Sequence, residues 1–362
     1  MSPSKTHKAV ATFGPRKPLQ LIDVPTVKPP GKEVCIKVAW TASTPLDLHQ
    51  ADGGLLVNPP QVLGDGASGI VVEVGDAVER LKVGDEVFGF TWRSQQDKAH
   101  QEYITAPENL FGLIPKRMAA EAVVTVPNNL VCVCHTLTHD LHLLFPWPLP
   151  ENYVPEEFEV PILIWGGSSS VGQYALQVLK YLGYKNLITT ASPKHHQMLK
   201  DYGARITVDY NSVDVVDQIL KLAGGKVKYA IDCIASREGS LEPISKILEA
   251  GSIVAVSLPV IIRDATDTVL PEYSMEPDKA VKWADGVEVV GTRTHFYLEN
   301  KFFEEHLQAE IIPLLLASGD VVPNRQRIVN GETLLERAEN ALDLLRRKVP
   351  SGERLVWRVA EP

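Results

Sequence analysis

Cysteine is scarce in this chain of 362 residues, and its four cysteines form no Cys-x-x-Cys pair. They are Cys35, Cys132, Cys134 and Cys233, each set among apolar neighbours. Neither a disulfide framework nor a four-thiolate zinc site can be built from this spacing. Reduced thiols are therefore expected.

Basic residues are also in deficit, because 36 Lys and Arg face 45 Asp and Glu, for a formal net charge of −9. Nucleic acids and anionic membranes both favour an excess of Lys and Arg, so neither is expected as a partner. No apolar run reaches the roughly 18 residues of a membrane span. Residues 1–8 lack the apolar core of a signal peptide. The expected location is the cytoplasm.

The strongest local signal is an apolar run, a turn of Gly and Ser, and then a helical pattern. Residues 161–165 fit a strand buried on both faces, and apolar residues recur at helical spacing over 171–182. The turn between them, residues 166–172, has the sequence GGSSSVG. Its backbone N–H groups and the helix N-terminus would favour a phosphate. Ser169 replaces the middle glycine of a G-x-G-x-x-G pattern, and a turn without a ligand is the alternative.

The length suggests two domains, because a single core rarely grows beyond about 300 residues. Residues 8–112 hold short apolar or alternating runs broken by Pro and Gly, which is typical of a β-rich unit. The expected strands of this unit include 8–13, 33–38, 68–75 and 85–90. A helical pattern follows over 117–143, and the Pro-rich stretch 145–155 is expected to be a surface loop.

After the glycine turn, strand and helix patterns alternate, which predicts a doubly wound parallel sheet with its ligand at the carboxyl ends of the strands. The expected strands are 186–191, 205–209, 229–234 and 252–257, and the helices are 195–202, 213–222 and 240–249. Two further helices are expected at 302–316 and 333–348. The closing strand, 354–359, is expected to return to the β-rich unit.

The end of the second strand, A-S-P-K-H-H over residues 191–196, carries no carboxylate. NAD sites usually place an acidic residue there for the ribose 2′-hydroxyl, whereas NADP sites accommodate a 2′-phosphate. Ser192 offers a hydroxyl, Lys194 a positive charge, and His195 and His196 possible donors, so NADPH is favoured over NADH. In the alternative, Ser192 only caps the next helix and the basic side chains lie in solvent.

Together with the glycine turn and the Ser192 tract, three stretches resemble a zinc-free medium-chain dehydrogenase/reductase: 62–75, 81–89 and 352–356. The chain is similar to quinone oxidoreductases and to the fungal trans-acting enoyl reductases that serve polyketide synthases, from about residue 8 to 359. The resemblance implies an α/β fold: a GroES-like β-rich substrate domain (1–130), a Rossmann NADP-binding domain (131–301), and a C-terminal return that completes the GroES-like domain (302–362).

Two positions depart from the patterns of that family. Asp65 stands within Gly-Asp-Gly where zinc-dependent relatives carry Gly-His-Glu, and one carboxylate cannot rebuild a site that takes thiolate or imidazole ligands. Cys132, Cys134 and His135 are close in sequence but lack a fourth ligand at suitable spacing. No metal is therefore expected. His49 stands where zinc-free relatives often have Lys or Tyr.

The resemblance also implies the site residues. His49 would be a proton donor or a phosphate partner, or else an ordinary loop histidine. Thr136 would sit beside the nicotinamide and the substrate carbonyl, or else bond its own helix backbone. Tyr210 would pack on the adenine side, or be an ordinary aromatic residue at a strand end. His49 and Thr136 are thus the catalytic candidates. The implied cofactor contacts are Leu46, Asp47, His49, Gly167, Ser168, Ser169, Ser170, Val171, Gly172, Ser192, Pro193, Lys194, His195, Tyr210, Ser257, Leu258, Leu355 and Val356.

The leading functional hypothesis is NADPH-dependent reduction of a carbon–carbon double bond conjugated to a carbonyl. Without zinc to polarise an alcohol or ketone, the substrate must already be an electrophile. Hydride would reach the β carbon, water or His49 would protonate the α carbon, and Thr136 or a backbone N–H would donate to the developing enolate. The expected partners are a small-molecule or carrier-bound enoyl substrate and a polyketide synthase. A quinone reductase is the alternative enzyme, and a non-catalytic NADPH-binding sensor or partner protein is the alternative outside enzymes. Both a monomer and a homodimer are compatible with the sequence.

Overall fold

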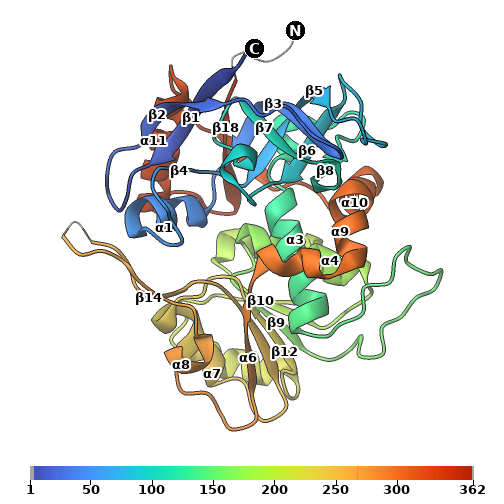
Figure 1. The fold of residues 1–362 in the computed structure, drawn as a ribbon. Helices are drawn as coiled ribbons and strands as arrows, with labels where there is room; N and C mark the ends of the chain where they lie inside the picture. Colours follow the sequence, from blue (N-terminus) through green and yellow to red (C-terminus); the bar gives the residue numbers. More distant parts are fainter. Residues whose placement is uncertain (1–3, 267, 361–362) are drawn as a thin grey trace. The chain divides into compact units, whose positions relative to one another are not determined.

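The computed structural model describes residues 4–266 and 268–360, and the chain divides into two compact units (Figure 1). Unit 1 comprises Met1–Asn128 and Leu298–Pro362, and unit 2 comprises Asn129–Tyr297. The domain limits given by the resemblance stay a prediction. Among the described residues, no helix has both the length and the apolar character needed to cross a bilayer.

Unit 1 is built on β-sheets, as the turn-rich pattern of its sequence predicts. One sheet has the order β17-β18-β3-β5-β6-β8, with β7 also paired to β3, and a second has the order β2-β1-β4. The strands are β1 (Thr6–Thr12), β2 (Gln20–Pro25), β3 (Glu33–Ala42), β4 (Gln61–Val62), β5 (Gly66–Val74), β6 (Glu86–Phe90), β7 (Tyr103–Pro107), β8 (Phe111–Leu113), β17 (Arg325–Ile328) and β18 (Glu353–Arg358). The predicted return of the last strand is confirmed, because β18 pairs antiparallel with β3 through Val356 and Ala42.

The helices of unit 1 pack on its sheets and include one that the sequence reasoning missed, α1. They are α1 (Pro45–Gly53), α2 (Ala120–Val123), α9 (Lys301–His306), α10 (Ile312–Ser318) and α11 (Leu334–Arg346), with short 3-10 turns at Gln95–Asp97 and Glu108–Leu110. A π turn at Leu307–Ile311 interrupts the helix expected over 302–316. Pro313 lies in the first turn of α10 and has no N–H to continue the α-helical ladder, which accounts for the interruption.

Unit 2 contains the predicted doubly wound parallel sheet. Its strand order is β11-β10-β9-β12-β13-β16, and every pairing is parallel. The strands are β9 (Ile162–Trp165), β10 (Leu187–Thr190), β11 (Ile206–Val208), β12 (Tyr229–Asp232), β13 (Ile253–Ser257) and β16 (Glu288–Thr292). β9 lies between β10 and β12, so the strand order reverses beside it, and all four of its residues are buried. Such a reversal is where α/β sheets bind ligands.

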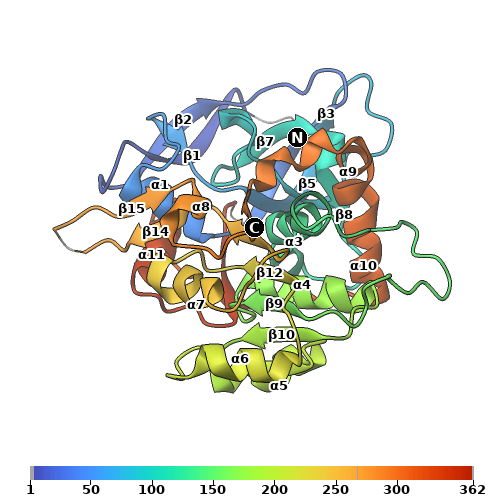
Figure 2. The same ribbon diagram turned by 90° about the horizontal axis from the view of Figure 1, so that it is seen from below.

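Unit 2 holds one helix before its first strand and others between or after its strands (Figure 2). They are α3 (Pro127–His135), α4 (Ser170–Tyr181), α5 (His196–Asp201), α6 (Val215–Ala223), α7 (Glu242–Ser245) and α8 (Pro277–Ala280), and a hairpin joins β14 (Val260–Arg263) to β15 (Glu272–Ser274). The helix predicted over 240–249 is shorter than expected and ends at Ser245. A π turn (Arg237–Leu241) leads into the four residues of α7, because Pro243 cannot donate a hydrogen bond into the preceding turn.

Candidate functional site

The turn between β9 and α4 requires glycine at three positions. Gly166 has a φ of 84°, and a Cβ there would lie 2.5 Å from the Ile234 side chain. A Cβ on Gly167 would lie 2.0 Å from Oγ1 of Thr189, and one on Gly172 would lie 2.5 Å from the Gly166 carbonyl oxygen. The backbone at Gly172 therefore packs directly on the backbone at Gly166, and the backbone at Gly167 packs on the neighbouring strand β10. This close packing is what a phosphate-binding turn of this fold uses its glycines for.

Ser169 takes the place of the middle glycine without strain. Its φ is −65°, and its Oγ accepts a hydrogen bond from the Gly172 N–H at 3.1 Å, which makes it the N-cap of α4. Ser168, Ser170 and Val171 are half-buried, and Ser170 Oγ accepts from the Asn129 side chain at 2.6 Å. The serines thus order the N-terminus of a twelve-residue helix, whose partial positive charge suits a phosphate.

The tract after β10 brings together two of the predicted cofactor residues. The hydroxyls of Ser192 and Tyr210, from the ends of β10 and β11, lie 3.3 Å apart. Ser192 occupies an N-cap position, but its side chain makes no capping hydrogen bond, so capping alone does not account for it. Lys194 is exposed and forms no ion pair with any residue in 4–266 or 268–360, whereas His196 Nε2 lies 2.9 Å from the Ala191 carbonyl oxygen.

Thr136 is buried in a π turn, Thr136–Asp140, that continues α3. Its Oγ1 lies 3.4 Å from Oγ1 of Thr292, which in turn donates to Oδ2 of Asp140 at 2.7 Å. It is Thr138, not Thr136, whose hydroxyl bonds the helix backbone, at the Cys134 carbonyl oxygen. The sequence reasoning missed Thr292 and Asp140. Their signal was weak, because β16 was not predicted and a π turn has no recognised sequence pattern.

Leu46, Asp47 and His49 lie on α1, so His49 is in a helix and not in a loop, and whether it has a functional role stays a prediction. The carboxylate of Asp47 is 2 % exposed and accepts the backbone N–H groups of Thr44 at 2.8 Å and Gly64 at 3.1 Å. It therefore caps the helix and fixes the 64–66 turn. Leu46 and His49 are half-buried. Contacts of these residues with a cofactor stay a prediction.

Asp65 lies in a buried polar group of unit 1. Its Oδ1 accepts from the Asn128 amide at 3.1 Å, and the Arg354 guanidinium donates to the Ala42 carbonyl oxygen at 3.3 Å. Burial, together with the nearby charge of Asp47, raises the pKa of Asp65 to about 6. Burial likewise raises the pKa of Asp47 to about 6. Two carboxyl groups here resist ionising together.

The residues around Asp65 do not fit a catalytic zinc ion. The side-chain partner of Asp65 is an amide, not a thiolate or an imidazole. Within 4–266 and 268–360, a single group of three or more His, Cys, Asp or Glu side chains has donor atoms close enough to share a metal ion, and Asp65 is not in it. Carboxylate, amide and guanidinium groups are a poor match for a catalytic zinc site.

The remaining predicted contacts lie at strand ends or within strands. Ser257 is the last residue of β13 in unit 2, Leu258 follows it, and both are half-buried. Leu355 and Val356 belong to β18 in unit 1, where their side chains are buried in the core and their carbonyl oxygens accept from Ser43 and Val329. The glycine turn, Ser192, Tyr210 and Ser257 are therefore all at the carboxyl edge of one sheet, and Leu46, Asp47, His49, Leu355 and Val356 are in the other unit.

Comparison with known proteins gives two matching family models and many relatives. An alcohol dehydrogenase GroES-like domain model matches residues 30–135, and a zinc-binding dehydrogenase model matches residues 170–283. The trans-enoyl reductase buaC of Petromyces alliaceus is 33% identical over 240 residues, which are 65% of this chain and 64% of that protein. The trans-enoyl reductase tazE of Aspergillus terreus is 32% identical over 255 residues, 67% of this chain and 81% of that protein.

Solved structures agree with the fold. The quinone oxidoreductase of Coxiella burnetii superposes with a TM-score of 0.71 at 23% identity, covering 98% of this chain and 100% of that one. The CurK enoyl reductase superposes with a TM-score of 0.72 at 16% identity, covering 98% of each chain.

Proposed function

The chain belongs to the medium-chain dehydrogenase/reductase superfamily, and we propose that it is an NADPH-dependent, zinc-independent reductase of carbon–carbon double bonds conjugated to a carbonyl. The superfamily works with nicotinamide cofactors. We propose three properties beyond membership of this superfamily: NADPH as the cofactor, an enoyl substrate, and chemistry without zinc.

One observation carries the cofactor assignment: the meeting of Ser192 and Tyr210 beside exposed Lys194, at the end of a strand that carries no carboxylate. Two hydroxyls and an ammonium group suit a 2′-phosphate, whereas a bare ribose would leave the ammonium group without a role. The glycine turn and the N-terminus of α4 follow the neighbouring strand β9, and they would bind the pyrophosphate.

NADPH, when bound, supplies a hydride to the β carbon of the substrate. The chain itself would contribute hydrogen-bonding side chains to the reaction. Asp140 holds the hydroxyl hydrogen of Thr292, so the Thr292 oxygen is left to accept a hydrogen bond from Thr136. The Thr136 hydroxyl also meets the Cys132 thiol, and turning its hydrogen towards a substrate carbonyl oxygen would stabilise the developing enolate. His49 or water would protonate the α carbon.

The substrate class rests on the relatives. Several fungal proteins about 30% identical to this chain are named trans-enoyl reductases, which supports an enoyl group carried as a thioester. A synthase that makes polyketides in secondary metabolism is the partner that this implies. The unsuitability of Asp65 as part of a zinc site supports chemistry in which conjugation, not a Lewis acid, activates the substrate.

Oxidation of NADPH by purified protein, with an enoyl thioester and with a quinone in parallel, tests the proposal. We expect turnover of the thioester, and the matched pair Thr136→Val and Thr138→Val locates the chemistry, since only the first should lower kcat. Faster turnover of the quinone would assign the alternative activity. Tight NADPH binding without turnover of either would make the protein a non-catalytic binder.

A further inference from the structure

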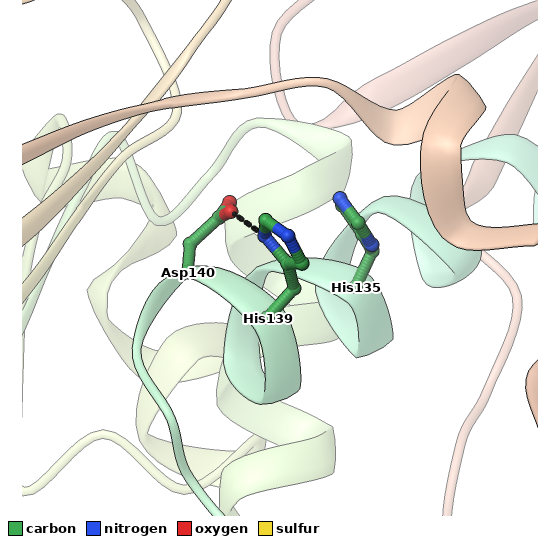
Figure 3. Close-up of side chains that lie close together, drawn as sticks. All are labelled: His135, His139 and Asp140. Atoms are coloured by element: carbon green, nitrogen blue, oxygen red, sulfur yellow. Dashed lines mark hydrogen bonds and ion pairs between the residues drawn. The ribbon is translucent and has the colours of Figure 1, made fainter. Parts of the chain in front are cut away.

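Three side chains that bind metals in many proteins gather where α3 passes into its π turn: His135, His139 and Asp140 (Figure 3). One donor atom from each lies within 4.8 Å of the others. In Figure 3 the ring of His139 lies between the Asp140 carboxylate and the ring of His135. None of the three is among the residues expected to contact the cofactor.

The backbone explains why these three meet. Residues four apart share one face of a helix, which places the two imidazoles side by side. Their rings stack with centroids 4.7 Å apart and planes 17° apart. The Leu141 N–H bonds the Thr136 carbonyl oxygen, five residues back, so the helix is locally wider than an α-helix. In this wider turn, residue 140 falls on the same side as residue 139.

The carboxylate of Asp140 is held in position by hydrogen bonds. Asp140 is 1 % exposed, and Thr292 donates to its Oδ2, which leaves Oδ1 facing Nδ1 of His139 at 2.8 Å. Ligands about 2.0 Å from a tetrahedral ion lie about 3.3 Å from one another. The His139–Asp140 separation is already close to that value, and the widest separation in the cluster must fall by at most about 1.5 Å. The His139 side chain is 64% exposed, so solvent and not packed protein borders it on its outer side.

We propose that His135, His139 and Asp140 bind one divalent transition-metal ion of the Zn²⁺ class. Two imidazole nitrogens and one carboxylate oxygen suit Zn²⁺, Co²⁺, Ni²⁺ or Cu²⁺, whereas Mg²⁺ and Ca²⁺ prefer sites made of oxygen alone. Three protein ligands leave a position for water or another ligand. The exposed edge of His139 is the entry path, and the Asp140–Thr292 bond orients the carboxylate from behind.

This site departs from the sequence-based expectation of no metal, and it is separate from the position at Asp65. The sequence reasoning weighed Cys132, Cys134 and His135, of which only His135 belongs to the cluster. Burial raises the pKa of the Cys132 and Cys134 thiols, so neither is readily available as a thiolate.

The test is metal binding by the full-length, untagged protein after treatment with a chelator, without substrate or cofactor. Zn²⁺ binding is measured by competition with a chromogenic chelator, and Co²⁺ binding by its visible absorption. The variants are His139→Ala and, as the matched control, His142→Ala. His142 is equally exposed, at 65%, lies three residues further on and is outside the cluster. Circular dichroism verifies that both variants fold.

We expect one ion per chain in the wild type and in His142→Ala, at least tenfold weaker binding in His139→Ala, and no comparable binding of Mg²⁺. Binding should weaken as the pH falls, because protons compete for the imidazoles. Absence of stoichiometric binding by the wild type overturns the proposal, as does binding that His139→Ala leaves unchanged, which would place the ion at other histidines. The result does not depend on whether the chain reduces enoyl substrates.

Discussion

Adding one methyl group to the glycine turn, as Gly167→Ala, should destabilise unit 2 through a single contact. The new Cβ would lie 2.0 Å from Thr189 Oγ1, more than 1 Å inside ordinary contact. Thr189 is fully buried, and its hydroxyl donates to the Ile164 carbonyl oxygen in β9 at 2.7 Å. Rotating the hydroxyl away would break this buried hydrogen bond, at about 1–3 kcal/mol, while overpacking costs about 1–3 kcal/mol.

A double-mutant cycle isolates this contact, with the free energy of unfolding measured by urea denaturation and circular dichroism. Thr189→Ala removes Oγ1 and Cγ2, so in that background the new Cβ of Gly167→Ala meets at closest the Cβ of residue 189, at 3.1 Å. We expect the double variant to be less destabilised than the sum of the singles by at least about 1 kcal/mol. If the losses of unfolding free energy in the two single variants simply add, Gly167 is not required by its contact with Thr189, and the explanation given for this glycine is wrong.

Three further predictions test other parts of the account. Ser169→Ala should cost about 1 kcal/mol of unfolding free energy by removing the cap of α4, and Ser169→Gly only a few tenths, both read from the same denaturation curves. Because the folded-state pKa of Asp65 is raised, its stabilising contribution is present below the pKa of the unfolded chain, about 4, and is lost as the pH rises towards about 6. Asp65→Asn should therefore flatten the fall in unfolding free energy across that window, and an unchanged profile would contradict the burial argument. Thr136→Val should lower kcat about tenfold or more with the KM for NADPH unchanged, whereas Thr136→Ser should retain most activity; equal losses in both would point to a packing role.

Local chemistry made much of the fold predictable from sequence. The β9 turn, α4 and the strand–helix alternation after it follow from apolar runs and glycine positions that any chain must satisfy locally. The Ser192 tract could be proposed as a cofactor-binding segment for the same reason, because its polar residues are adjacent in the sequence at the end of a short strand.

What could not be predicted depends on distant residues or on weak patterns. The apolar residues of α1 are not spaced for a helix, although Thr44, Pro45 and Asp47 form a capping signal that could have revealed it. Thr292 is 156 residues from Thr136, and only the sheet brings them together. The cluster of His135, His139 and Asp140 depends on a π turn, which changes which residues share a face.

Binding of NADPH and NADH, followed by intrinsic fluorescence for wild type and Lys194→Ala, tests the central claim most directly. We expect NADPH to bind the wild type at least tenfold more tightly than NADH, and Lys194→Ala to remove most of this preference while NADH binding is unchanged. Equal affinity for the two cofactors, or a preference that survives the substitution, would contradict the assignment of the Ser192 tract to the 2′-phosphate.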